Sequence, residues 1–215
     1  MPTPSVPTSQ SNGGFIGSSL PLPIMMLGAE TLCETAARLL FMNVRWAKTV
    51  PAFVSLPFRD QLSLLEESWR EFFVLGAAQF NLPLEMGPKL LGNSNNEEIL
   101  NEIKSCQDAI EKFREMNVDH TEFACLKAII LFKTDKKDCK EQKAIVGLQD
   151  QAQLTLSKYI NAAYPSQPMR FGKLLLLLPT LKCISAETIE NLFFRRTIGT
   201  IPIEKIICDM YKSAM

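Results

Sequence analysis

From residue 31 to the end of the chain, apolar residues recur at spacings of three and four, and β-strand alternation is absent. Spacings of three and four place side chains on one face of an α-helix, whereas strands alternate with a period of two. The pattern therefore predicts an all-α domain over residues 31–215. Because 47% of the 215 residues are hydrophobic, this domain has enough apolar material for one sizeable core.

The beginning of the chain has a different composition. Its first 23 residues, MPTPSVPTSQSNGGFIGSSLPLP, are rich in Pro, Ser, Thr and Gly. Such a segment buries too little apolar surface to offset the entropy lost on ordering. We expect residues 1–30 to form a disordered hinge or linker.

Proline, glycine and capping residues predict where the helices end. Pro51 closes the first helix, Pro57 suits the first turn of the second, and Asp119 with Glu122 resembles a capping box. Gly199 suits a helix C-terminus. We expect helices at about 31–50, 55–80, 97–116, 122–133, 141–163, 167–183 and 185–198, and a short one after Pro202. About eight helices without a strand predict an architecture of roughly three helical layers.

Charge and cysteine usage argue against several classes of function. Lys+Arg and Asp+Glu both number 23, so no excess of basic charge favours nucleic acid. The six cysteines are scattered without a C-x-x-C pair, which favours reduced thiols in an intracellular protein and no metal or cofactor. The densest apolar run, residues 174–178, is far shorter than the roughly 20 residues that cross a bilayer. We expect neither nucleic-acid binding by this stretch nor a membrane span.

The sequence contains few residues that are suited to catalysis. The single histidine, His120, lies in the loop-like stretch VDHTEF, where a solvated or capping role is expected. Glu66 and Glu67 are adjacent, so they point to different faces of a helix and cannot easily share a proton. No phosphate-binding glycine loop or nucleophile elbow occurs. We do not expect an enzyme.

Two apolar stripes on adjacent helices suggest a binding groove. Phe41, Val44 and Lys48 line one helix face, and a second face carries Leu62, Leu65 and Trp69. From periodicity alone, the core is the favoured place for both stripes. A short amphipathic helix near the chain end needs a surface on which to lie; its residues are Ile206, Ile207, Asp209, Met210 and Tyr211.

Three ordered motifs resemble the ligand-binding domain of nuclear receptors. FMNVRWAKTVPAFVSLPFRDQLSLLEESWREFFVL is similar to the signature of that family, including its A-K, P-x-F, L-P-x-x-D-Q and L-L elements. RFGKLLLLLPTL resembles the family's dimerisation helix, and ENLFFRRTIGTIPIEKIICDMYKS resembles the end of the domain with its terminal activation helix. DMYKS and TEFACLK look like the tailless group of orphan receptors, with the photoreceptor-specific receptor as the next most similar.

The resemblance implies a three-layer antiparallel helical sandwich with two functional surfaces. A groove for co-regulator helices would be formed by Phe41, Val44, Lys48, Gln61, Leu62, Leu65 and Glu66. Lys48 would hold the C-terminal carbonyls of a bound helix, and Asp209, where the family usually has Glu, would hold its N-terminal end. A homodimer surface would be formed by Arg170, Lys173, Leu174, Leu175, Leu176, Leu177 and Leu178.

The resemblance also implies a nuclear transcriptional repressor that recruits co-repressor peptides, of Atrophin type if the tailless likeness holds. The zinc-finger DNA-binding domain of such receptors is missing from this stretch. Phe80 stands where many relatives carry a ligand-anchoring arginine, and Phe72, Phe73 and Phe80 are expected to fill the ligand pocket. The rival function is a domain that senses a hydrophobic small molecule. The terminal helix is expected to block the groove, with completion of the clamp by Asp209 as the alternative pose.

Overall fold

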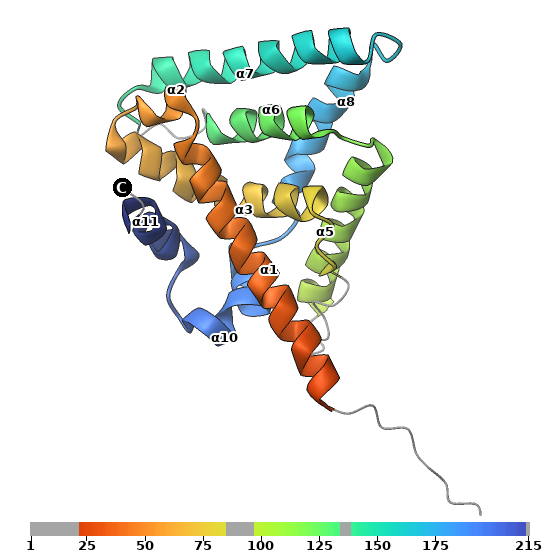
Figure 1. Ribbon diagram of the computed structural model, residues 1–215, viewed down its shortest axis with the longest axis vertical. Coiled ribbons are helices and arrows are strands. Elements are labelled where there is room, and N and C mark those ends of the chain that lie inside the picture. Colours follow the sequence, from red (N-terminus) through yellow and green to blue (C-terminus); the bar gives the residue numbers. More distant parts are fainter. Residues whose placement is uncertain (1–21, 85–96, 134–138, 214–215) are drawn as a thin grey trace, which may run out of the picture.

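The computed structural model describes residues 22–84, 97–133 and 139–213, and none of these belongs to a strand (Figure 1). The helices are α1 (Leu22–Lys48), α2 (Pro51–Val54), α3 (Phe58–Gln79), α5 (Glu97–Glu115), α6 (His120–Leu131), α7 (Gln142–Ala163), α8 (Arg170–Leu177), the 3-10 helix η2 (Leu178–Lys182), α9 (Ala186–Ile189), the π-helix η3 (Glu190–Phe194), α10 (Arg195–Ile198) and α11 (Ile203–Ser213). The predicted all-α helical sandwich is confirmed.

Helix α3 is the centre of the fold. It contacts α1, α5, α6 and α11, while α7 packs against the outer side of α6. Every residue from 71 to 78 of α3 is buried, which explains why this stretch is too apolar for a surface helix. The sequence indicated that this helix crosses the interior, and it does.

Charged side chains inside the fold fix α3 to its neighbours. Asp60 is fully buried and accepts hydrogen bonds from the backbone N–H groups of Lys140 (3.1 Å) and Glu141 (2.9 Å), at the beginning of α7. A carboxylate is favourable there because the first N–H groups of a helix have no partner within the helix. Glu71, also buried, forms an ion pair with Lys133 after the end of α6.

The local signals at helix ends were mostly right. Asp119 caps α6 by accepting from the N–H groups of Thr121 and Glu122, and the Glu122 carboxylate accepts from the Asp119 N–H, as in the predicted capping box. Gly199 has a φ of 64° and ends α10, a conformation that glycine adopts without steric cost.

Several helix boundaries differ from the prediction. Helix α1 begins at Leu22 rather than near residue 31, with Pro23 tolerated in the first turn, so it overlaps the predicted linker; residues 1–21 lie outside the described part. Residues 51–54 form the short α2, and Pro57 is the residue before α3 rather than within its first turn. The predicted helix at 167–183 is split into α8 and η2, because Pro179 cannot donate to a continuing α-helix.

Candidate functional site

The structure brings the predicted groove residues together on the facing sides of α1 and α3. Val44, Gln61 and Leu65 are buried, and Phe41 remains 50% exposed at the edge. The half-buried residues of the set are Lys48, Leu62 and Glu66. The short helix α2 turns the chain between the two stripes, so that both face the same space.

Helix α11 occupies this space. It packs against both α1 and α3, at the left of the molecule in Figure 1. Its buried residues are Ile203, Ile207 and Tyr211, at i, i+4 and i+8, which place one stripe of the helix against the groove. Ile206 and Met210 are half-buried beside that stripe.

Ile207 is the central apolar contact. It lines a space of only about 10 Å³ together with Leu40, Val44, Leu65 and Trp69. Such a space is about the size of one water molecule, so the contact between α11 and the groove is closely packed.

Tyr211 joins the end of α11 to both sides of the groove. Its hydroxyl donates to Oε1 of Gln61, whose own Nε2 donates to the carbonyls of Val54 (2.8 Å) and Leu56 (2.7 Å). The ring centroid lies 6.1 Å from that of Phe53. Burial raises the pKa of the Tyr211 hydroxyl. Gln61 therefore links the turn between α2 and α3 to the terminal helix.

Lys48 caps the same end of α11. Its ammonium donates to the backbone carbonyl of Tyr211 and lies 4.6 Å above the centroid of the Tyr211 ring. Burial lowers the pKa of Lys48. A cation at the last carbonyls of a helix is stabilising, because those carbonyls carry the negative end of the helix dipole. Lys48 thus holds α11 in the way that the resemblance implied for a bound peptide helix.

The beginning of α11 is held by contacts that sequence reasoning missed. The indole N–H of Trp69 donates to Oε1 of Glu204 at 2.9 Å, and the Ile203 N–H donates to Oε1 of Glu190 at 3.1 Å. An acidic residue in the first turn of a helix, such as Glu204 here, is a known signal of a helix start. Its partner Trp69 lies on a distant helix, so no local pattern could have identified it.

Asp209, proposed from the resemblance as the second half of a clamp, is exposed on α11. With α11 in the groove, the carboxylate that is bound near the N-terminal end of α11 is that of Glu204, which accepts from Trp69. Glu204 thus takes, for α11, the place that the resemblance gave to Asp209 for a bound peptide.

The predicted dimerisation segment is only partly at the surface. Leu176 is 77% exposed and Lys173 is exposed, whereas Leu175, Leu177 and Leu178 are half-buried against the core. Leu174 is completely buried, so its placement on the homodimer surface was wrong.

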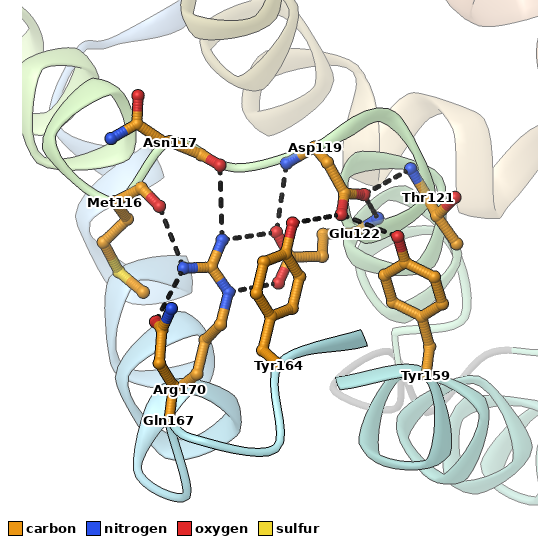
Figure 2. A network of polar contacts seen from close by, with 9 residues as sticks. All are labelled: Met116, Asn117, Asp119, Thr121, Glu122, Tyr159, Tyr164, Gln167 and Arg170. Carbon is orange, nitrogen blue, oxygen red and sulfur yellow. Dashed lines mark hydrogen bonds and ion pairs between the residues drawn. The ribbon is translucent and has the colours of Figure 1, made fainter. Parts of the chain in front are cut away.

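Arg170 was also wrongly placed on the homodimer surface, because it is buried in a polar network (Figure 2). Its guanidinium donates to both carboxylate oxygens of Glu122, at 2.6 and 2.7 Å. The remaining donors reach the carbonyls of Met116 (3.0 Å) and Asn117 (3.3 Å) and Oε1 of Gln167 (3.2 Å). All five N–H groups of the arginine therefore have a partner.

Asp119 extends the network toward α7, as Figure 2 shows. The hydroxyls of Tyr159 and Tyr164 both donate to its Oδ2 at 2.7 Å. Burial alone would raise the pKa of Asp119, but hydrogen bonds from the Glu122 N–H, the two tyrosines and the Thr121 N–H hold it below its usual value. The hydrogen bond between Tyr164 and Asp119 raises the pKa of Tyr164 to about 12. We name this network of Asp119, Glu122, Tyr159, Tyr164 and Arg170 the polar corner.

Aromatic rings fill the interior behind the groove. Phe72 and Phe73 are buried as predicted, and Trp46 lies edge-on to Phe72 with centroids 5.8 Å apart. Phe193 and Phe194 of the π-helix η3 pack on Phe73 at 5.4 and 6.1 Å. Phe80, by contrast, is 45% exposed at the end of α3, so its predicted place in the interior was wrong. The length of α3 carries Phe80 past the core.

Other kinds of site are not evident in the described residues. Among them, no group of three or more His, Cys, Asp or Glu side chains could hold a metal ion. No helix in the described ranges is long and apolar enough to cross a membrane. His120 is exposed at the first position of α6.

Comparison with known proteins identifies what this arrangement is similar to. The family model described as the ligand-binding domain of nuclear hormone receptor matches residues 21–198. Nuclear receptor subfamily 2 group F member 6 of Homo sapiens is 42% identical over 197 residues, covering 87% of this chain and 49% of the relative. The Mus musculus protein of the same name is also 42% identical over 197 residues, covering 87% of the chain and 50% of the relative.

An insect protein gives a comparable match. Steroid receptor seven-up, isoforms B/C, of Drosophila melanogaster is 42% identical over 200 residues, covering 89% of this chain and 37% of the relative. The chain thus spans about half of the curated relatives it matches, or less. None of these three relatives is a tailless receptor, so that finer assignment stays a prediction.

Proposed function

The chain belongs to the family of nuclear hormone receptor ligand-binding domains, a family of transcription factors rather than enzymes, and from this premise we propose that its α1–α3 groove binds helical co-regulator peptides and is closed in cis by α11. The observation that carries the proposal is a pair of contacts made by Tyr211: its carbonyl accepts from Lys48, and its hydroxyl donates to Gln61. A helix already lies in the groove with its C-terminal carbonyl on the lysine.

The spacing of α11 supports mimicry of a peptide. Ile207, Met210 and Tyr211 stand at i, i+3 and i+4, the spacing of the L-x-x-L-L anchors of co-activator helices. Ile207 and Tyr211 are buried and Met210 is half-buried, so α11 buries two of its three anchor side chains completely. A peptide helix would need the same surface, so the two compete.

The link between α10 and α11 gives α11 the advantage. Only residues 199–202 separate the two helices. A segment tethered by so short a link competes at an effective concentration of order millimolar, which exceeds what a free peptide of micromolar affinity reaches at ordinary levels. The closed groove favours repression, because co-activator peptides are excluded unless α11 is displaced.

We further propose that the whole protein is a nuclear orphan receptor that represses transcription and recruits co-repressor peptides, with Atrophin-type partners as the expectation from the likeness to the tailless group. The family's DNA-binding zinc fingers would reside elsewhere in such a protein. Homodimer formation is proposed through the exposed side of α8. Leu176→Glu tests this by size-exclusion chromatography with light scattering, because Leu176 is exposed and the variant should fold as a monomer. A folded variant that remains dimeric contradicts it.

Packing behind the groove supports a domain that works without a small-molecule ligand. The rings of Phe72, Phe73, Phe193 and Phe194 are all buried there. Phe80, which stands where the resemblance gives many relatives a ligand-anchoring arginine, supplies no positive charge for an acidic ligand. Native mass spectrometry of the purified domain tests this, since a retained hydrophobic molecule would support the rival function as a ligand sensor.

The groove itself is tested by removing α11. Deleting residues 203–215 should raise the affinity for a fluorescent L-x-x-L-L peptide by about tenfold or more, measured by anisotropy. Ile207→Ala with Met210→Ala should raise it less, because part of the helix contact remains. Lys205→Ala is the matched control, since Lys205 is exposed on the same helix and should leave the affinity unchanged.

Two further results decide the proposal. In the truncated protein, Lys48→Ala should weaken peptide binding, because the peptide then relies on the lysine that α11 has released. Weaker peptide binding after the deletion, in a protein that circular dichroism shows to be folded, would mean that α11 completes the clamp instead of closing the groove.

A further inference from the structure

Two cysteines from distant parts of the chain meet where α5 packs against η2. Cys106 is on α5 and only 1% exposed, and Cys183 directly follows η2 and is half-buried. Their thiols form a hydrogen bond with one another. Both are free thiols. The contact therefore connects α5 to the segment that follows α8.

The two thiols differ in access. Cys183 lines an open hollow of about 380 Å³ together with Lys112, Lys182, Asp108 and Thr180, whereas Cys106 lies behind it in the core. Two lysines at the mouth of the hollow make the approach favourable for an anion or a polar reagent. A reagent from solvent meets Cys183 first.

The surroundings also shift the pKa values of the two thiols in opposite directions. The hydrogen bond from Cys106, outweighing burial and assisted by the charge of Arg70, lowers the pKa of Cys183, although Glu102 acts in the opposite direction. The same hydrogen bond, together with burial, raises the pKa of Cys106 well above its ordinary value. An accessible thiol with a lowered pKa beside a buried thiol with a raised pKa is the arrangement of an attacking and a resolving cysteine.

We propose that Cys183 is a site of oxidative modification by hydroperoxides and that Cys106 resolves the product as a Cys106–Cys183 disulfide. This reactivity lies outside the groove and does not depend on α11. It takes a small hydroperoxide as its substrate class, with hydrogen peroxide as the simplest member.

The chemistry proceeds in two balanced steps. The Cys183 thiolate attacks one peroxide oxygen, the O–O bond breaks, and hydroxide leaves, so that Cys183 becomes a sulfenic acid. The Cys106 thiol then gives up its proton and attacks the Cys183 sulfur, the S–O bond breaks, and the second hydroxide leaves. The two released hydroxides take up two protons and become water. The thiols lose two electrons, which the peroxide gains.

The disulfide would act on the neighbouring turn as well. Ser185 follows Cys183 closely and donates from its N–H (3.0 Å) and its hydroxyl (2.9 Å) to Glu102 on α5. A covalent link beside these bonds would fasten the start of α9 to α5. Closing a long loop of chain stabilises the folded state, so the oxidised protein should melt several degrees higher than the reduced one.

The first test uses the unmodified protein. The rate of alkylation by iodoacetamide at neutral pH is measured for each cysteine by mass spectrometry. Cys183 should react about tenfold or more faster than Cys33 and Cys125, which are also half-buried but whose pKa values burial raises. These two cysteines are the matched controls within the same molecule. Equal rates at all three sites would overturn the proposal.

The second test follows peroxide. After treatment of the unmodified protein, the non-reduced digest should contain a Cys106–Cys183 linked peptide, and Cys106→Ser should instead leave a Cys183 sulfenic acid that dimedone traps. Cys125→Ser should behave as the unmodified protein does. A Cys183 that oxidises while Cys106 stays a free thiol in the unmodified protein would overturn the resolving role, whether or not the variants fold.

Discussion

The polar corner and the seat of α11 hold helices in two different ways. In the corner, Arg170 and Glu122 are both buried and every guanidinium N–H is paired. The contact of α11 with α1 and α3, which we call the seat, relies on the apolar face of Ile207, on the hydrogen bond from the Tyr211 hydroxyl to Gln61, and on single bonds from Lys48 and Trp69. A buried charge cannot leave its partner without a large desolvation cost, whereas single hydrogen bonds outside a buried ion pair can be replaced by bonds to water or to a peptide. We therefore expect the polar corner to stay fixed and α11 to leave its seat more easily.

The largest expected effect comes from breaking the corner. Arg170→Met should lower the free energy of unfolding by about 3–5 kcal/mol, because it leaves the Glu122 carboxylate buried without its partner. Urea unfolding followed by the fluorescence of Trp46 and Trp69 measures this. The double variant with Glu122→Gln should lose less than Arg170→Met alone. An equal loss in both would show that the ion pair does not govern the corner.

A smaller effect is expected from Asp119, which serves both as helix cap and as acceptor for two tyrosines. Asp119→Ala should cost about 2 kcal/mol. Because its folded pKa is depressed, the carboxylate contributes stability that is present above its unfolded pKa of about 4 and is lost as the pH falls through the folded value. Urea midpoints between pH 5 and 2.5 should therefore fall more steeply in the unmodified protein than in Asp119→Asn. Parallel profiles would contradict this account.

How far these elements followed from the sequence depends on the range of the contact. The capping box of Asp119 and Glu122 lies within four residues, so its residue types alone revealed it. The burial of Arg170 was missed because its partner is on another helix and because an arginine before a leucine run is typical of an exposed position. The groove stripes were visible from spacing, but that α11 rests on them depended on a resemblance.

The seat of α11 should respond to substitution without a comparable loss of overall stability. Tyr211→Phe removes the hydroxyl that pairs with Gln61 and should weaken the docking of α11 by about 1–2 kcal/mol. Peptide affinity should then rise by roughly 5- to 30-fold, while the urea midpoint changes little. Anisotropy and urea unfolding of the same preparation measure both. A large loss of stability with no gain in peptide affinity would place α11 with the corner, as a fixed element.

The smallest expected effect is at the other end of α11. Glu204→Gln keeps an acceptor for the Trp69 indole N–H but removes the negative charge from the first turn of the helix. A charge in that place contributes about 0.5 kcal/mol, so peptide affinity should rise by only about twofold. High salt should erase the difference between the variant and the unmodified protein, because it screens the interaction. An effect that persists in high salt would point to the hydrogen bond instead.

The π-helical turn η3 makes the number of residues in its segment important for the fold. A π-turn holds one residue more than an α-turn, and here two successive rings, Phe193 and Phe194, both face the interior. Removal of a single residue from 190–194 would turn this segment into an ordinary α-helix and rotate everything after it by about 100°. One of the rings would then leave the core, and α11 would approach the groove with a different face. Over evolutionary time this stretch should therefore tolerate exchange of one side chain for another more readily than any change in residue number.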